Sequence, residues 1–228
     1  MASLDERRAE LLAGVPTWYP GLLHLLAINL VTLLAIAGCL ARLREVAPWE
    51  WALVPLSLAF ANLFEWWVHR GPLHRRAPGL ARLYERHTRT HHVYFTHERM
   101  ALRSPRELAL VLFPPWMVPL LVLMLAPLAL ALGLWRWNLA WLFLASGLAY
   151  YLLYEWLHLM HHLPPESWLG RRRLVAALRR HHWRHHDPTR MLAGNFNVSF
   201  PLADGLLGTV LRDPAPEAPA LGAPPRDP

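Results

Sequence analysis

The sequence predicts an all-α integral membrane protein with four transmembrane helices and a helical cap on the cytoplasmic side. Hydrophobic residues make up 54% of the 228 residues, above the roughly 45–50% of ordinary soluble domains. Long apolar segments recur along the chain, and arginines gather between alternate segments. Because Cys39 is the single cysteine, the sequence excludes a disulfide framework and a site built from several thiolates.

The first two apolar segments are residues 22–40 and 51–68. Residues 22–40 carry no formal charge over 19 residues, which is long enough to cross ~30 Å of hydrocarbon. The second segment contains Asn62 and Glu65 near its end and runs directly into His69. We therefore expect two transmembrane helices, the second with a polar last turn.

Two further apolar segments, residues 108–135 and 137–157, are separated by Arg136 alone. The first contains four prolines within its 28 residues, and proline breaks or kinks a helix. The connection at Arg136 leaves almost no loop. The pattern therefore predicts a broken third helix that forms an antiparallel hairpin with the fourth.

Arginine distribution predicts the orientation of these helices. Nine arginines lie between residues 69 and 107 and seven between residues 161 and 190, against Arg42, Arg44 and Arg136 in the opposite turns. The positive-inside rule places the arginine-rich side, with both termini, in the cytoplasm. All 23 basic residues are arginine, a composition typical of GC-rich bacteria, so we expect a multi-pass protein of a bacterial inner membrane.

The chain is expected to divide into three parts. Residues 1–20 are predicted as a cytoplasmic N-terminal segment without a cleaved signal sequence, residues 21–212 as the membrane domain, and residues 213–228 as a disordered proline-rich tail. The formal net charge of +7 is explained by arginines that contact anionic lipid head groups. No nucleic-acid partner is expected.

Histidines carry the strongest chemical signal in this sequence. Of 14 histidines, two are isolated, His24 and His97. His181 is ambiguous, because His181 and His185 also have helical spacing, but the motif that begins at His182 is favoured. Residues three and four apart share a helical face, so clustered histidines present several imidazoles in one direction. Imidazole binds transition metals that take four to six ligands, so two ions are expected. The eleven candidate ligands are His69, His74, His87, His91, His92, His158, His161, His162, His182, His185 and His186.

Two carboxylates precede histidines at helical spacing. Glu65 lies four residues before His69, and Glu155 lies three before His158. We expect both to orient the ligand imidazoles by accepting hydrogen bonds; the alternative is pairing with arginine or reaching the membrane interface.

The segment after the last cluster contains further polar candidates. Asp187 is expected either to orient an imidazole or to cap the turn before Pro188. Asn197 is expected to hydrogen-bond to the metal site or to a water, as is Asn195. Asp204 is typical of a turn or cap.

The ordered motifs HRGPLH, HTRTHH, HLMHH, HWRHH and NFNVSFPLADGLLGT resemble the fatty acid hydroxylase/sterol desaturase superfamily of membrane oxygenases over residues 65–209. The resemblance implies a dinuclear centre, usually iron, that uses O2 to hydroxylate or desaturate a lipid. It implies all the clustered ligands above, with His158 joined by His161 or His162. Thr88 stands where the family's second motif commonly has its first histidine, so ligation by His87 is open. Zinc is expected to be able to replace iron in purified protein.

The leading hypothesis is an O2-dependent di-iron lipid hydroxylase supplied with electrons by a separate cytochrome-like or ferredoxin-like protein. A desaturase or methylsterol oxidase on the same metal core is the alternative within enzymes. A histidine-rich metal transporter or storage protein is less favoured, because transport ligands lie near mid-membrane whereas these clusters lie at helix ends.

Overall fold

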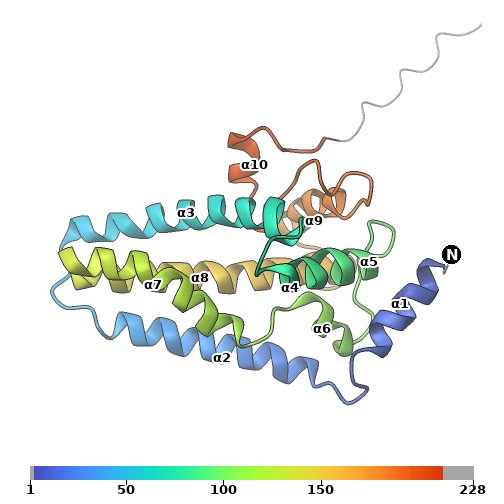
Figure 1. Ribbon diagram of the computed structural model, residues 1–228, viewed down its shortest axis with the longest axis horizontal. Coiled ribbons are helices and arrows are strands. Elements are labelled where there is room, and N and C mark those ends of the chain that lie inside the picture. The colour runs from blue at the N-terminus through green and yellow to red at the C-terminus, as the bar shows by residue number, and fades with distance from the viewer. Residues whose placement is uncertain (1–2, 213–228) are drawn as a thin grey trace, which may run out of the picture.

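The computed structural model describes residues 3–212, and within that range it contains helices and no strands. Four long helices run along the long axis of the molecule, and shorter helices gather at one end (Figure 1). The long helices are α2 (Gly21–Leu40), α3 (Leu53–Val68), α7 (Met117–Trp135) and α8 (Trp137–His162). The tail predicted over residues 213–228 lies outside the described residues.

The shorter elements connect the long helices and build the cap. They are α1 (Leu4–Ala13), η1 (Pro48–Ala52), η2 (His69–Leu73), α4 (Ala81–Tyr84), η3 (Glu85–His91), α5 (His92–Tyr94), η4 (Pro105–Glu107), α6 (Leu108–Val111), α9 (Arg173–His185) and α10 (Leu202–Leu206).

Three helical segments of the described chain are long and apolar enough to cross a membrane: Gly21–Leu40, Pro48–Leu73 and Met117–Trp135. Their outer surfaces expose large apolar side chains, such as Leu26 on α2 and Leu123 on α7. Such a surface is unfavourable in water and matches lipid hydrocarbon. The protein is therefore a membrane protein.

Helix α8 was expected as a fourth span, but it is not among the segments selected by length and apolarity. It packs against α2, α3 and α7, so most of its side chains face protein. Buried positions with hydrogen-bonding partners tolerate polar residues, and α8 buries Ser146, Tyr150 and Glu155. The fourth crossing stays a prediction.

The expected proline break is confirmed. Helix α6 ends at Val111, the chain is extended at Leu112, and α7 begins at Met117, two residues after Pro115. Helices α7 and α8 form the expected antiparallel hairpin around Arg136 (Figure 1).

Buried polar contacts close the end of the bundle that lies away from the cap. The Glu50 carboxylate is fully buried. It accepts hydrogen bonds from Arg136 Nε at 2.7 Å and Asn138 Nδ2 at 3.2 Å. These contacts join η1 to the turn between α7 and α8 and fix that end of the hairpin.

Candidate metal centre

Ten histidine side chains meet in two buried groups where the long helices enter the cap. Within each group, one ring nitrogen of every histidine lies within 4.8 Å of the others. Every member is buried, and neither group contains a carboxylate among the described residues. The first group is His69, His74, His87, His92 and His185; the second is His91, His158, His162, His182 and His186.

The first group is assembled by two π-helical turns. A π-helix closes its hydrogen bonds over five residues rather than four, and η2 and η3 both have this form. His69 and His74 therefore stack with ring centroids 5.0 Å apart, and Nε2 of His87 lies 3.1 Å from Nε2 of His92. At a spacing of four, His87 and His91 stack with ring centroids 5.4 Å apart, but the wider turn places His91 in the second group.

The second group uses ordinary α-helical spacing. His158 and His162 are four apart on α8, and His182 and His186 are four apart at the end of α9. The histidines that lie three residues after His158 and His182, namely His161 and His185, are not members of this group. His185 joins the first group, whereas His161 donates from Nε2 to the Val198 carbonyl at 2.8 Å.

Three other histidines lie outside both groups. His181 pairs its Nε2 with Asp204 Oδ2 at 3.0 Å, as expected from the frame that begins at His182. His24 contacts Tyr19 and the Phe113 carbonyl. His97 lies against the Trp183 ring.

Backbone carbonyls orient half of the ten rings through the nitrogen that faces away from the group. Each such Nδ1 must carry the proton to donate, which leaves Nε2 as a lone pair available to a cation. The donor and acceptor pairs are His69 to Phe196, His91 to Leu110 (2.9 Å), His162 to Met100 (2.9 Å), His185 to Gly194 (2.9 Å) and His186 to Phe95 (2.5 Å).

Thr88 performs the same task for His74. Its Oγ1 donates to the Leu73 carbonyl at 2.7 Å and, since its one proton is thereby used, accepts from His74 Nδ1 at 3.1 Å. At the position where the resemblance expects a histidine, this chain has a hydroxyl that orients one. His87 itself lies in the first group.

The electrostatics keep these imidazoles neutral at pH 7. Burial, reinforced by the nearby His185 and His91, lowers the pKa of His74 to about 2. Burial also lowers the pKa of His91 and of His185 to about 4, against the opposing effect of their carbonyl partners. A metal ligand must be the neutral imidazole, so the groups are already in the binding form.

The donor set fits divalent transition metals. Nε2 of His162 is buried and has no hydrogen-bond partner among residues 3–212, although its Nδ1 has one. Leaving a buried nitrogen unpaired is unfavourable, and an ion in the second group would satisfy it. Five neutral imidazoles per group match the preference of iron, zinc and copper for nitrogen donors.

The expected orienting role of the carboxylates needs correction. Glu65 contacts none of the imidazoles; its Oε1 accepts from the backbone N–H groups of Val198 and Ser199 at 2.5 and 3.0 Å. The peptide between these two residues also presents the Val198 carbonyl to His161. Glu65 is therefore linked to the His161 imidazole through the peptide between Val198 and Ser199, which lies between the two side chains.

The other three expected residues also contact groups other than the ligands. Glu155 accepts from the Phe113 N–H, where the break after α6 leaves that donor free. Asp187 caps its own turn through Thr189. Asn197 exchanges hydrogen bonds with Asn62 and Asp204. Their positions near histidines in sequence do not place them on the rings in space.

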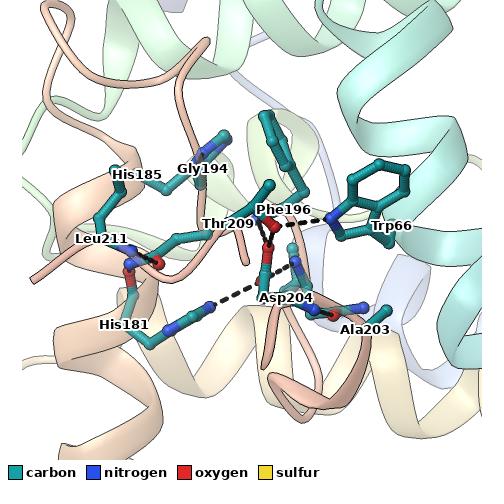
Figure 2. Close-up of polar contacts among 12 residues, drawn as sticks. Trp66, His181, His185, Gly194, Phe196, Ala203, Asp204, Thr209 and Leu211 are labelled. Carbon is teal, nitrogen blue, oxygen red and sulfur yellow. Dashed lines mark hydrogen bonds and ion pairs between the residues drawn. The ribbon is translucent and has the colours of Figure 1, made fainter. Parts of the chain in front are cut away.

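Asp204 is the residue that sequence reasoning undervalued. Its fully buried carboxylate accepts from the N–H groups of Phe196 at 3.0 Å and Asn197 at 2.8 Å, from Thr209 Oγ1 at 2.6 Å, and from His181 (Figure 2). Burial alone would raise its pKa, but the hydrogen bonds from His181, Thr209 and the backbone hold that pKa below its ordinary value. The available signal was that Asp204 is the single charged residue in 191–211.

Asp204 reaches the first histidine group through one peptide unit. The peptide between Phe196 and Asn197 donates its N–H to Asp204 and accepts at its carbonyl from His69 Nδ1. Hydrogen bonds at the two ends of a peptide polarise one another. The negative charge of Asp204 therefore supports His69 without contact.

Asn195 shapes the loop that supplies these carbonyls. Its φ of 56° lies in the left-handed region, which asparagine tolerates better than most residues. Its side chain donates to the His181 carbonyl and accepts from the Leu211 N–H, both at 2.7 Å. Beside it, a Cβ on Gly194 would lie 2.1 Å from the Thr209 carbonyl oxygen. The close approach of the backbone at Gly194 to the backbone at Thr209 therefore requires glycine at this position.

The family model named fatty acid hydroxylase matches residues 54–209, which is more than half of the chain and contains every histidine of both groups. The chain belongs to the fatty acid hydroxylase family. Helices α1 and α2 lie outside the matched residues.

A solved structure described as full length scs7p, with only its hydroxylase domain visible, is similar to this chain. The TM-score is 0.54 at 23% sequence identity, and the match covers 85% of this chain and 66% of that chain. At this identity the similarity shows the fold. No match was found among curated protein sequences.

Proposed function

We propose that this protein is an O2-dependent di-iron monooxygenase that hydroxylates a C–H bond of a membrane lipid. The observation that carries the proposal is the pair of buried five-histidine groups at the end of an apolar helix bundle. Two bound iron ions would supply the oxidising power for C–H cleavage with O2. The balanced reaction takes R–H, O2, two electrons and two protons to R–OH and water.

The protein's own residues would hold the ions and exclude water. The carbonyls of Phe95, Leu110 and Phe196 fix three of the rings, so the ligands are oriented before any ion binds. Phe95 and Phe196 are themselves fully buried or nearly so and shield both groups from solvent. A void of about 10 Å³ touches His87, His91 and His158, and this is room for about one water-sized molecule.

We also propose that α8 is the fourth crossing and that the cap faces the cytoplasm of a bacterial cell. Exposed tryptophans support a membrane boundary at the opposite end, because indole rings concentrate at interfaces; they are Trp49, Trp51, Trp135 and Trp137. Reporter fusions after Arg44, Glu98, Arg136 and Pro228 test this topology. An external Glu98 would contradict it. In this arrangement a cytoplasmic cytochrome-like or ferredoxin-like donor would supply the electrons.

The reaction is tested with iron-loaded protein, a reductase system, a lipid extract and ¹⁸O2. Mass spectrometry should find ¹⁸O in a new lipid hydroxyl group, with no product from a His185→Ala variant. A new double bond without label would instead support a desaturase. Label that arrives only from water would reject the oxygenase. Metal flux in proteoliposomes without a lipid product would favour transport, which the placement of all ten histidines at one end of the bundle disfavours.

A further inference from the structure

A cleft of about 840 Å³ lies beside the metal centre, between the N-terminal helix and the cap. One wall is a stripe on α1 formed by Arg7, Glu10, Leu11 and Gly14. Residues spaced three, four and seven apart share one face of a helix, so this whole face of α1 is turned to the cleft. The volume is in the range of small-molecule sites.

The opposite wall of the cleft belongs to the cap, and its residues are likewise three, four and seven apart in sequence. Arg86, Arg89, Thr90 and Val93, from η3 and α5, line the cleft opposite α1. This stripe adjoins the second histidine motif in sequence, and Arg86 at its start also borders the small void that touches His87, His91 and His158. Apolar residues complete the lining, and they include Val15 and Leu110.

Helix α1 is fixed in this position by several contacts. Ser3 and Glu6 form a capping box at its start, and Asp5 pairs with Arg99 of the cap. The guanidinium of Arg8 lies 4.6 Å from the Tyr94 ring centroid. Arg106 donates to the carbonyl of Leu12 at 2.6 Å. The cleft is therefore a built feature of the fold.

The lining is cationic and its outer cations are unpaired. It contains three arginines and one carboxylate, Glu10. Across residues 3–212, the guanidinium groups of Arg7 and Arg89 have no ion-pair, hydrogen-bond or ring partner. Two exposed cations that line one cleft and form no ion pair with its carboxylate, Glu10, make a favourable site for an anion.

Arg86 connects the cleft to the metal centre. Its Nη2 donates to the carbonyls of Ala109 and Leu112, at 2.8 Å for Ala109. Arg86 and Leu110 line both the large cleft and the small void that touches His87, His91 and His158. An anion held in the cleft thus lies one side chain away from the wall of the metal site.

We infer that this cleft binds the anionic head group, carboxylate or phosphate, of the lipid that the enzyme oxidises. The inference rests on the proposed function and names the class of its substrate. Arg7 and Arg89 would hold the head group, and the apolar lining around Leu110 would direct the chain toward the histidines. Since residues 54–209 carry the family match, the α1 wall is a feature that the match does not describe.

The test is a binding measurement on full-length protein loaded with zinc, which is redox-inert, in phosphatidylcholine nanodiscs. Octyl phosphate, octanol and inorganic phosphate are titrated by calorimetry, with empty nanodiscs subtracted. The double variant Arg7→Gln with Arg89→Gln should weaken octyl phosphate binding by ~10-fold or more, the effect of losing charge-assisted hydrogen bonds. The double variant Arg7→Lys with Arg89→Lys should retain most of the affinity. Octanol should bind at least ~10-fold more weakly than octyl phosphate.

The matched control removes two exposed arginines that lie outside the cleft, by Arg82→Gln with Arg173→Gln, and should leave octyl phosphate affinity unchanged. Equal weakening in control and cleft variants would overturn the site. Octanol binding as tight as octyl phosphate would overturn the role of charge, and equally tight inorganic phosphate would indicate a free-anion site instead of a lipid site. If the cleft variant bound octyl phosphate normally in its zinc form but its iron-loaded form were reduced more slowly by an acidic donor, the arginines would belong to the donor site and the inference would be overturned.

Because zinc-loaded protein does not turn over, this result is independent of the ¹⁸O2 experiment. Lipid binding that depends on Arg7 and Arg89, without oxygen incorporation in the iron form, would sink the proposed function alone. Oxygen incorporation with binding that ignores both arginines would sink this inference alone.

Discussion

Nε2 of His74 lies 2.9 Å from Nε2 of His185, and neither nitrogen has a proton to donate to the other. The Nδ1 proton of His74 is donated to Thr88, and that of His185 to the Gly194 carbonyl. Both rings are neutral at pH 7, because their pKa values are lowered to about 2 and about 4. Two lone pairs in contact repel each other. A cation shared by the two nitrogens converts this repulsion into two coordinate bonds.

Elemental analysis should therefore find two transition-metal ions per chain. His185→Ala should lower the content by about one ion, because it removes a ligand from the first group. His97→Ala is the control, since His97 lies outside both groups, and should keep two. One ion or none in carefully handled wild-type protein would count against the dinuclear centre.

The two neighbouring histidines at the end of α8 should behave differently. His162→Ala removes a member of the second group and should lower metal content. His161→Ala removes only the hydrogen bond to the Val198 carbonyl and should leave two ions bound. Metal analysis of the pair decides between them, and a larger loss from His161→Ala would reverse the assignment.

Asp204→Asn should weaken metal retention by ~10–100-fold, the usual effect of losing a group that supports ligands from behind. An amide nitrogen cannot accept the hydrogen bonds that the carboxylate accepts from Phe196, Asn197, Thr209 and His181. Competition with a chelator measures the change. Asp187→Asn alters an exposed cap and should retain wild-type affinity; equal loss in both variants would contradict the relay through the Phe196–Asn197 peptide.

Thr88→Val should destabilise the protein by about 1–3 kcal/mol, because the His74 Nδ1 and the Leu73 carbonyl would both be left buried without a partner. Thr88→Ser keeps the hydroxyl and should restore most of the loss. The thermal melting midpoint of metal-free protein in detergent reports the difference. If valine and serine variants melted together, the hydroxyl would have no orienting role.

The metal-free protein should become less stable as pH falls from 6.5 toward about 4. In the unfolded chain histidine takes up its proton near pH 6.5, whereas burial lowers the pKa of His91 and His185 to about 4 in the fold. Between these values the unfolded chain binds more protons, so the free energy of unfolding decreases on acidification. The melting midpoint should fall across this window; a constant or rising midpoint would contradict the prediction.

The long helices and the histidine clusters could be predicted from the sequence because both are dense, repeated signals. The break before α7 followed from Pro114 and Pro115. The partition of the histidines could not be predicted, because a π turn at residues 85–91 changes the period by one residue without a sequence signature. The hydrogen-bond acceptors that orient the rings were missed for another reason. The carbonyls of Gly194 and Phe196 belong to the backbone, so no residue type in the sequence indicates them.

Adjacent histidines divide between the two groups at two places in the chain. His91 belongs to the second group and His92 to the first; His186 belongs to the second and His185 to the first. Consecutive Cα atoms across a trans peptide are separated by ~3.8 Å, a length that covalent bonding fixes. The distance between the two histidine groups is therefore constrained at two places, by the planar peptide between His91 and His92 and by the one between His185 and His186. Lipid fluctuations that rock the bundle helices would move the two sites as a unit and leave their mutual register unchanged.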